Sequence, residues 1–414
     1  MSDYEILDEV EYLEDDACLE KKMVLMHKDV PVMDVVFADD YIVSVGHVYN
    51  KDHLPIMDRM KDSKPKVGSF STWWQGRGIP KHRVGINELF SNIPPEYRKS
   101  AILQSMNLGL SLSDQYWIRP EGSDVSWEDV NYFHNDFGHQ LENVCMNEES
   151  IMVPEDVCLI GPSSSLGGNQ KKAWKIMDGR RYMIKESRQP YYQEAVDEVI
   201  GSDVCEFLGI PHVDYQKMEY DGRLFSVCSV GITDSEDLIT FYDLSNYLDI
   251  TNNTGALDVC RKFLAEHDIQ DNIDDLIVVD YVLRNTDRHL RNMCIVRDAD
   301  TGEYTRMFPA FDFGNSLWYD VATEMIDNKP VVNQLTGRMF EDDLRKVKGI
   351  SFREDKLLQI PLIVEKHLLD AGYKRDRVSI ITDSISERID TVDKYLGLGL
   401  ASDKEEIYDT GLDY

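Results

Sequence analysis

The chain has 414 residues, a formal net charge of −32 and 42% hydrophobic residues. This length exceeds what one small core needs, so we expect two or three domains or lobes. The acidic balance disfavours direct nucleic-acid binding, because phosphate recognition needs clustered Lys and Arg. No run approaches the ~20 apolar residues of a membrane-spanning helix, and the acidic start differs from a signal peptide, which predicts no membrane association and a cytoplasmic protein.

Cysteine usage indicates reduced thiols. The seven cysteines are odd in number, form no C-x-x-C pair and mostly lie in apolar stretches. We therefore expect buried core thiols, as is typical of a reducing compartment. They are Cys18, Cys145, Cys158, Cys205, Cys228, Cys260 and Cys294.

Residues 1–150 are predicted to form an N-terminal α+β domain of unknown role. Apolar stretches between Met23 and Tyr49 are typical of a small sheet, and residues 88–110 look helical. The adjacent Trp73 and Trp74 stand between glycines. They could form an exposed recognition surface, but we favour a loop that aromatic side chains anchor in a core.

A boundary is expected near residues 147–155, followed by a serine- and glycine-rich stretch over 161–172. Such a stretch lets backbone N–H groups converge on phosphate oxygens, and Lys171 or Lys172 can add positive charge. A plain flexible loop is the alternative. The nucleotide-binding hypothesis assigns phosphate contacts to Ser165, Gly167, Gly168 and Lys172.

The next segment predicts a hairpin and then a helix. Residues 173–176 and 182–185 read as strands around the turn Asp178-Gly179, which places Lys185 where it can reach ATP phosphates. An apolar stripe over 193–208 predicts a helix that ends at Gly209. Glu194 or Glu198 on this helix could pair with Lys185, and the other one is expected to be a solvated acid.

Beyond residue 213 we expect the second half of a small lobe and then a helical lobe. Residues 213–220 and 223–230 predict another hairpin, and 225–231, which includes Cys228, is predicted to connect the lobes where an adenine base would bond to the backbone. The rest reads as mainly helical. The expected helices cover residues 237–248, 255–267, 271–284, 341–347, 355–371 and 376–396.

The segment 280–316 carries three polar residues at spacings that suit phosphoryl transfer. Asp287 and Asn292 stand five apart, and Asp312 follows a predicted hairpin that turns at 298–302. A kinase needs an Asp as the base for the acceptor hydroxyl, and an Asn and a second Asp to hold Mg²⁺. The Asp287–Asn292 spacing and the Asp312 turn, each taken alone, are more often structural than functional. Their order along the chain and the predicted strands between them favour a phosphoryl-transfer site.

Taken together, these elements resemble HipA-type kinases, bacterial serine/threonine kinases known from toxin and antitoxin pairs. The resemblance rests on the stretch from Ser163 to Lys172, the Lys185 strand, the Glu198 helix, N-T-D-R-H-L-R-N at 285–292 and the Asp312 turn. It covers residues 155–400. It implies an α+β, two-lobed protein-kinase-like fold with a sheet-rich lobe at 151–233, a helical lobe at 234–400 and an acidic tail at 401–414.

The resemblance also implies roles for single residues. Asp287 would be the catalytic base, Asn292 and Asp312 the Mg²⁺ ligands, and Lys185 would hold the α- and β-phosphates. His289 would orient the catalytic loop by hydrogen bonding. Ser165 stands at the head of the phosphate loop, where family members autophosphorylate, with Ser163 and Ser164 as neighbouring candidates.

The expected function is ATP- and Mg²⁺-dependent phosphorylation of serine or threonine in a protein. The resemblance adds two expectations, autophosphorylation of the phosphate loop and a toxin–antitoxin role with an antitoxin-like protein partner. Two alternatives stay open: a kinase that acts on a small molecule or lipid headgroup, and an inactive kinase-fold interaction module.

Overall fold

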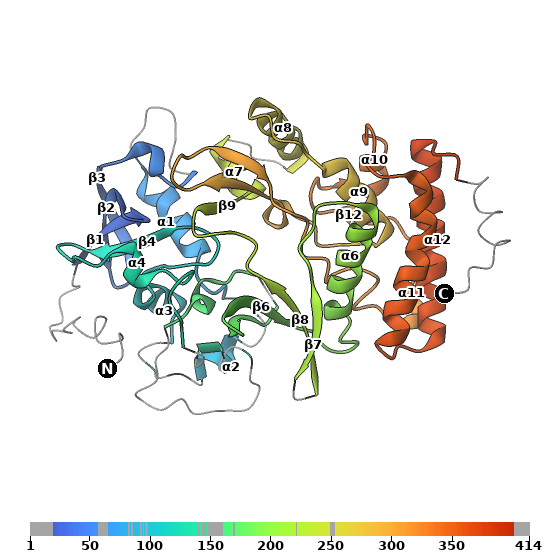
Figure 1. Ribbon diagram of the computed structural model, residues 1–414, viewed down its shortest axis with the longest axis horizontal. Coiled ribbons are helices and arrows are strands. Elements are labelled where there is room, and N and C mark those ends of the chain that lie inside the picture. Colours follow the sequence, from blue (N-terminus) through green and yellow to red (C-terminus); the bar gives the residue numbers. More distant parts are fainter. Residues whose placement is uncertain are drawn as a thin grey trace.

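The computed structural model describes residues 20–400, apart from 57–64, 82, 84–85, 92, 94, 96–97, 139–140, 143–145, 147–159, 169, 221 and 249–252. Figure 1 shows the N-terminal region at one end, a small sheet in the middle and a helical lobe at the other end. The boundary expected at 147–155, the tail at 401–414 and three of the cysteines lie outside the described residues. The division at residues 150 and 233 stays a prediction.

The N-terminal region is built on a four-stranded antiparallel sheet in the order β3-β2-β1-β4. This confirms the small sheet expected from the apolar stretches. Its strands are β1 (Glu20–His27), β2 (Val30–Ala38), β3 (Tyr41–Val48) and β4 (Tyr116–Pro120), and its helices are α1 (Val67–Gly76), α2 (Ile86–Ser91), α3 (Ser100–Met106) and α4 (Trp127–Val130).

The tryptophan pair lies in helix α1, so the expectation of a loop there was wrong. Trp74 is 3% exposed and packs in the core against the sheet, with its ring 5.5 Å from that of Phe37. Trp73 stacks on Phe70 on the same helix. The pair therefore anchors the helix to the sheet, in agreement with core packing rather than an exposed recognition surface.

The central sheet has the order β5-β6-β8-β7 and is antiparallel throughout. Both predicted hairpins are confirmed, and Asp178 and Gly179 have positive φ angles of 49° and 71°, as a tight hairpin turn requires. Helix α6 ends at Gly209 with a φ of 84°. The elements are β5 (Lys172–Met177), β6 (Arg180–Glu186), α6 (Glu194–Leu208), β7 (Gln216–Tyr220) and β8 (Arg223–Ser229).

The predicted connector between lobes begins later than expected. Residues 225–229 belong to β8 and pair with β6, so only the stretch from Val230 onward can connect the lobes. The sequence predicted both a strand over 223–230 and a connector over 225–231, and the ladder to β6 decides for the strand.

The helical lobe surrounds α9, whose residues are almost all buried. It also holds a three-stranded sheet, β11-β10-β9. Residues 236–240 form strand β9 rather than the start of the expected helix, because they pair with β10. The elements are β9 (Glu236–Thr240), α7 (Phe241–Tyr247), α8 (Asn253–Glu266), α9 (Ile273–Val282), β10 (Cys294–Asp298), β11 (Tyr304–Met307), β12 (Val332–Asn333), β13 (Arg338–Met339), α10 (Phe340–Leu344), α11 (Ile360–Asp370) and α12 (Arg375–Leu396).

A buried charge cluster joins the N-terminal sheet to the helical lobe. Asp237 on β9 accepts hydrogen bonds from His27 on β1, at 3.0 Å, and from Arg297 on β10, at 2.6 Å. All three side chains are about 1% exposed. Because a buried charge is costly without a partner, this cluster fixes the two regions against each other.

The expectation that the cysteines are buried thiols is confirmed for the four that the structure describes. Cys205, Cys228, Cys260 and Cys294 are buried free thiols.

Among the described residues, no helix combines the length and the apolar character needed to cross a membrane.

Candidate active site

The site is centred on Lys185, on strand β6, beside helix α6. Its Nζ lies 2.6 Å from Glu198 Oε1 and 2.7 Å from Asp312 Oδ1. Burial alone would lower the pKa of this ammonium group, but Asp312 and Glu198 outweigh that effect and raise the pKa well above its ordinary value. Lys185 is therefore a fixed positive charge that two carboxylates hold in place.

The structure decides between the two glutamates of α6. Glu198 pairs with Lys185, as one of the two alternatives predicted. Glu194 is not the solvated acid that we expected, because it is 1% exposed and pairs with Arg188 at 2.6 Å. Helix α6 therefore contributes two buried glutamates, one turn apart, each in an ion pair.

The second oxygen of Glu198 fixes the turn that carries Asp312. Phe313 N donates to Glu198 Oε2 at 2.8 Å, and the Phe313 ring is fully buried. A Cβ added to Gly201 on α6 would lie 2.2 Å from Phe313 Cγ, so the ring occupies the space that this glycine leaves. Asp312 itself has a φ of 64°, a conformation that a non-glycine residue rarely adopts.

Asp312 is an ionised carboxylate. Burial acts to raise its pKa, but Lys185 and Lys172 outweigh burial and hold the pKa well below its usual range. A carboxylate that stays charged in a basic environment suits a metal ligand next to phosphates.

Asp287 lies in the loop after α9. Its Oδ2 accepts a hydrogen bond from Asn315 Nδ2 at 2.7 Å, and Asn315 Oδ1 in turn accepts one from Arg188 at 3.2 Å. Burial raises the pKa of Asp287, while His289, Asn315 and Arg188 act to lower it. One carboxylate oxygen is thereby oriented and the other is left for a proton acceptor role.

Asn292 and Asp312 are brought together by Arg288. This arginine is 1% exposed, donates to Asp280 at 2.9 Å, and uses Nη1 to bond the carbonyls of Asn292 and Phe311. Asn292 Nδ2 donates to the Asp287 carbonyl at 3.0 Å. This leaves the Asn292 amide oxygen as the atom that can face a metal.

The role expected for His289 stays a prediction. Its Nδ1 is buried without a hydrogen-bond partner. Arg288, the residue before it, donates hydrogen bonds to the carbonyls of Asn292 and Phe311 and so holds the loop.

The residues present fit a Mg²⁺ ion bound with ATP. Mg²⁺ prefers oxygen ligands and is often bound through one or two protein groups together with phosphates and water. Asn292 and Asp312 offer one amide oxygen and one carboxylate. Among the described residues no group of three or more His, Cys, Asp or Glu could hold a metal by itself.

The three serines of the phosphate loop differ in exposure. Ser163 and Ser164 are buried, with Ser163 Oγ accepting from Trp174 N and Ser164 Oγ donating to Gly161 O, each at 3.0 Å. Ser165 is half-buried and donates to Pro162 O at 2.8 Å. Only Ser165 of the three has a partly accessible side chain.

Lys172 lies opposite Lys185 in the β5–β6 ladder. Burial and the charge of Lys185 lower its pKa to about 8. Gly168, with a φ of 85°, leaves room for it, since a Cβ there would lie 2.8 Å from Lys172 Nζ. Gly167 lies beside it in the loop, and both glycines can let the backbone approach a phosphate.

The N-terminal region holds the phosphate loop at both ends. Asn107 Oδ1 accepts from Gly161 N at 2.5 Å. Arg83, which is 6% exposed, donates to three consecutive carbonyls, those of Leu166, Gly167 and Gly168. Because a peptide's N–H points away from its C=O, fixing these carbonyls also fixes the directions of the following amides.

Cys228 lies within β8, opposite Met183 of β6, with its side chain buried against Val199 and Tyr215. Burial raises the pKa of its thiol to about 11. Its predicted nucleotide contact is not tested by these contacts and stays a prediction.

Sequence reasoning missed four residues of the site, namely Arg83, Arg188, Arg288 and Asn315. Arg288 follows Asp287 directly and Asn315 lies three residues after Asp312, so closeness to these predicted site residues was the available signal. Arg83 bonds a loop more than 80 residues away, and no local pattern indicates such a contact.

The chain was compared with family models, curated proteins and solved structures. No family model matches the chain. The chain is 25% identical over 202 residues to the serine/threonine-protein kinase CtkA of Helicobacter pylori, a match that covers 44% of this chain and 62% of that protein. The chain thus spans less than two thirds of this relative's length.

Two solved structures are similar. The HipA, HipB and operator DNA complex of the Shewanella oneidensis MR-1 toxin–antitoxin system matches with a TM-score of 0.54 and 11% identity, over 91% of this chain and 97% of that one. The crystal structure of the proinflammatory kinase CtkA of Helicobacter pylori gives a TM-score of 0.44 and 18% identity, over 57% of this chain and 95% of that one. The chain therefore has a HipA-like kinase fold and is a relative of a serine/threonine-protein kinase.

Proposed function

We propose that this chain is a protein kinase that transfers the γ-phosphate of ATP to a serine or threonine hydroxyl, with Mg²⁺. The observation that carries the proposal is the position of Lys185, which Glu198 and Asp312 hold at 2.6 and 2.7 Å from two different elements. A lysine so held offers a preorganised charge to the α- and β-phosphates.

Each residue then has a task in the transfer. Lys185 and Lys172 offset phosphate charge, and the amide oxygen of Asn292 with the carboxylate of Asp312 would hold Mg²⁺, which neutralises charge on the phosphates when bound. Asp287, oriented by Asn315, accepts the proton of the acceptor hydroxyl. The adenine would bond to the backbone beyond Ser229, where β8 ends.

Autophosphorylation of the phosphate loop is part of the proposal, and Ser165 is the residue we assign. It is half-buried and its hydroxyl has one hydrogen bond, to Pro162 O. Ser163 and Ser164 are buried and would need a larger rearrangement.

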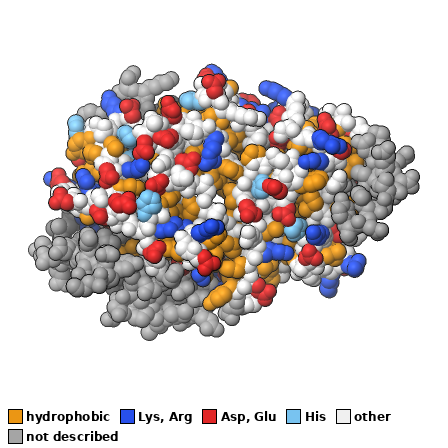
Figure 2. Space-filling model, in the orientation of Figure 1, with side chains coloured by type: hydrophobic (Ala, Val, Ile, Leu, Met, Phe, Trp, Pro, Cys, Tyr) orange, Lys and Arg blue, Asp and Glu red, His pale blue; other side chains and the backbone are white. Residues whose placement is uncertain are grey.

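Two observations bear on binding partners, namely the composition of the similar HipA complex and the distribution of charged side chains on this chain. The similar HipA structure is a complex with HipB and operator DNA, and we propose an antitoxin-like protein partner for this chain. Direct DNA contact is not proposed. On the face seen in Figure 2, acidic and basic side chains are interspersed rather than gathered into a basic field.

The test is incubation of the purified chain with ATP and Mg²⁺, followed by intact-mass and peptide mass spectrometry. Asp287→Asn is the inactive variant, and Asp300→Asn, at an ion pair with Lys28, is the matched control. Phosphate on Ser165 in the wild type and in Asp300→Asn, but not in Asp287→Asn, supports the proposal.

Two results would favour the alternatives. Turnover on a small molecule or lipid headgroup without any phosphoprotein indicates a different acceptor. ATP binding without transfer to protein or small-molecule acceptors indicates an inactive interaction module.

A further inference from the structure

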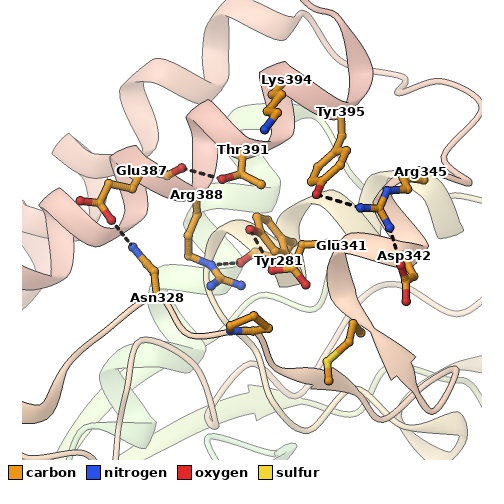
Figure 3. A pocket seen from close by; sticks show the side chains of 12 residues that line it. Tyr281, Asn328, Glu341, Asp342, Arg345, Glu387, Arg388, Thr391, Lys394 and Tyr395 are labelled. Atoms are coloured by element: carbon orange, nitrogen blue, oxygen red, sulfur yellow. Dashed lines mark hydrogen bonds and ion pairs between the residues drawn. The ribbon is translucent and has the colours of Figure 1, made fainter.

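A pocket of about 520 Å³ lies on the helical lobe, between α9, α10 and α12, and shares no lining residue with the kinase site. Figure 3 shows side chains from these elements converging on it. The residues that the binding argument uses are Tyr281, Asn328, Glu341, Arg388 and Lys394.

Arg388, on α12, is a buried cation without a carboxylate partner among the described residues. It is 2% exposed, its Nε donates to Tyr281 O at 2.6 Å, and its guanidinium carbon lies 4.0 Å from the centre of the Tyr281 ring. Its Nη2 is buried and has no hydrogen-bond partner. The buried Arg288 and Arg297, in contrast, each pair with an aspartate.

Binding of an anion would stabilise the buried guanidinium of Arg388. Burial lowers the pKa of Arg388 to about 10, and Tyr281 and Glu341 oppose that effect only in part. A buried charge that lacks hydrogen bonds is costly, and an incoming carboxylate can satisfy a guanidinium with two parallel hydrogen bonds.

The same pocket holds an unused acceptor. Asn328 Nδ2 donates to Ser384 O at 3.0 Å and to Glu387 Oε2 at 2.8 Å, so the amide orientation is fixed by two acceptors. Its Oδ1 is then buried without a partner. This oxygen needs an N–H or O–H donor.

The charges around the pocket limit the ligand class. Lys394, which Figure 3 shows on α12 at the edge of the pocket, makes no ion pair within the described parts of the chain. Glu341, Asp342 and Glu387 bring negative charge to the same pocket. These acids repel a polyphosphate, whereas a single carboxylate beside an amino group meets complementary partners.

We propose that this pocket binds a small molecule that carries a carboxylate and an amino group, as a free amino acid does. The carboxylate pairs with Arg388, and the amino group donates to Asn328 Oδ1 and is attracted by the neighbouring acids. This site is separate from the proposed kinase site and does not depend on it.

The test uses the full chain and measures thermal shift and calorimetric binding. The probes are the single L-amino acids, the amine-free carboxylates acetate and propionate, and inorganic phosphate. At least one amino acid is expected to raise the melting temperature, propionate less so, and phosphate not at all. Arg388→Met, which replaces the buried charge with an apolar side chain of similar length, is expected to lower the affinity at least about tenfold.

Two further variants separate a binding role from a structural one. Arg345→Met is the control, because Arg345 lines the same pocket but already pairs with Asp342 and contacts Tyr395, and it should bind the amino acid as wild type does. If Arg388→Met does not fold, Asn328→Ala serves instead, and it should weaken binding of the amino acid but not of propionate. The proposal is overturned if no amino acid binds, if the variants of Arg388 and Asn328 bind as wild type does, or if phosphate binds in place of carboxylates.

Discussion

The ammonium group of Lys185 lies 2.6 Å from Glu198 Oε1, and this pair ties strand β6 to helix α6. The other oxygen of Glu198 accepts the backbone N–H of Phe313. One buried carboxylate thus sets the position of Lys185 and of the turn that carries Asp312.

Glu198→Gln is expected to lower phosphotransfer at least about 100-fold, because Lys185 loses the charge that holds it against the phosphates. The amide can still accept from Phe313 N, so folding should be retained. Rates of autophosphorylation, measured by mass spectrometry over time, test this. Glu206→Gln, on the exposed side of the same helix, is the control and should react at the wild-type rate. Equal rates in both variants would contradict the role of Glu198.

Gly201→Ala should destabilise the chain and reduce activity. Alanine normally stabilises a helix by about 0.5–1 kcal/mol relative to glycine, but here its Cβ would overlap the Phe313 ring. Overpacking of this kind costs about 1–3 kcal/mol. Thermal melting and the transfer rate are both measured.

The control for that substitution is Gly68→Ala in helix α1, where an added Cβ meets nothing within 4 Å. It should leave activity unchanged and raise or preserve the melting temperature. If Gly201→Ala behaves in the same way, the packing of Phe313 against α6 does not set the site.

Local signals in the sequence predicted much of the kinase lobe. Asp178-Gly179 fixes a hairpin turn by its backbone preference, and Gly209 ends α6 for the same reason, so neither depends on distant contacts. The two-residue period of a strand then predicts the face on which Lys185 lies, whereas the helix turn left Glu194 and Glu198 open as its partner. These are the parts of the site that lie on regular elements.

Long-range contacts decided the parts that were wrong. Residues 236–240 form a strand because β10 pairs with them, and Asp237 is buried because Arg297 and His27 meet it. In the loop after α9, Arg288 donates to the carbonyls of Asn292 and Phe311, and local preference does not determine such contacts. The same holds for Glu194, whose partner Arg188 lies outside its helix.

ATP affinity should depend on the protonation of Lys172. Its pKa is lowered to about 8 by burial and by Lys185, so the ammonium form is lost as the pH rises through 8. We therefore expect the KM for ATP to rise above pH 8 and to be lowest below it. Lys172→Met should have a high KM at every pH and no inflection near 8. An unchanged inflection in this variant would assign the titration to another group.

The phosphotransfer rate should also fall at low pH, because Asp287 must be ionised to accept a proton. Burial raises its pKa above the ordinary value, and His289 and Asn315 only oppose this effect. The transfer rate at saturating ATP is expected to fall as the pH drops through that raised pKa. Asn315→Ala removes a hydrogen bond to the carboxylate form, so it should move the acidic limb to higher pH. A limb that stays in place would mean that Asp287 does not control it.

Arg83→Ala should weaken ATP binding although Arg83 lies outside the kinase lobes. Its guanidinium fixes the carbonyls of Leu166, Gly167 and Gly168, and each lost hydrogen bond costs about 1 kcal/mol. We expect the KM for ATP to rise at least about tenfold, with a smaller change in the rate at saturation, since Asp287 and Lys185 are untouched. Arg306→Ala, at a partly exposed ion pair on β11, is the matched control. A KM in Arg83→Ala equal to that of the control would show that the phosphate loop keeps its shape without the N-terminal region.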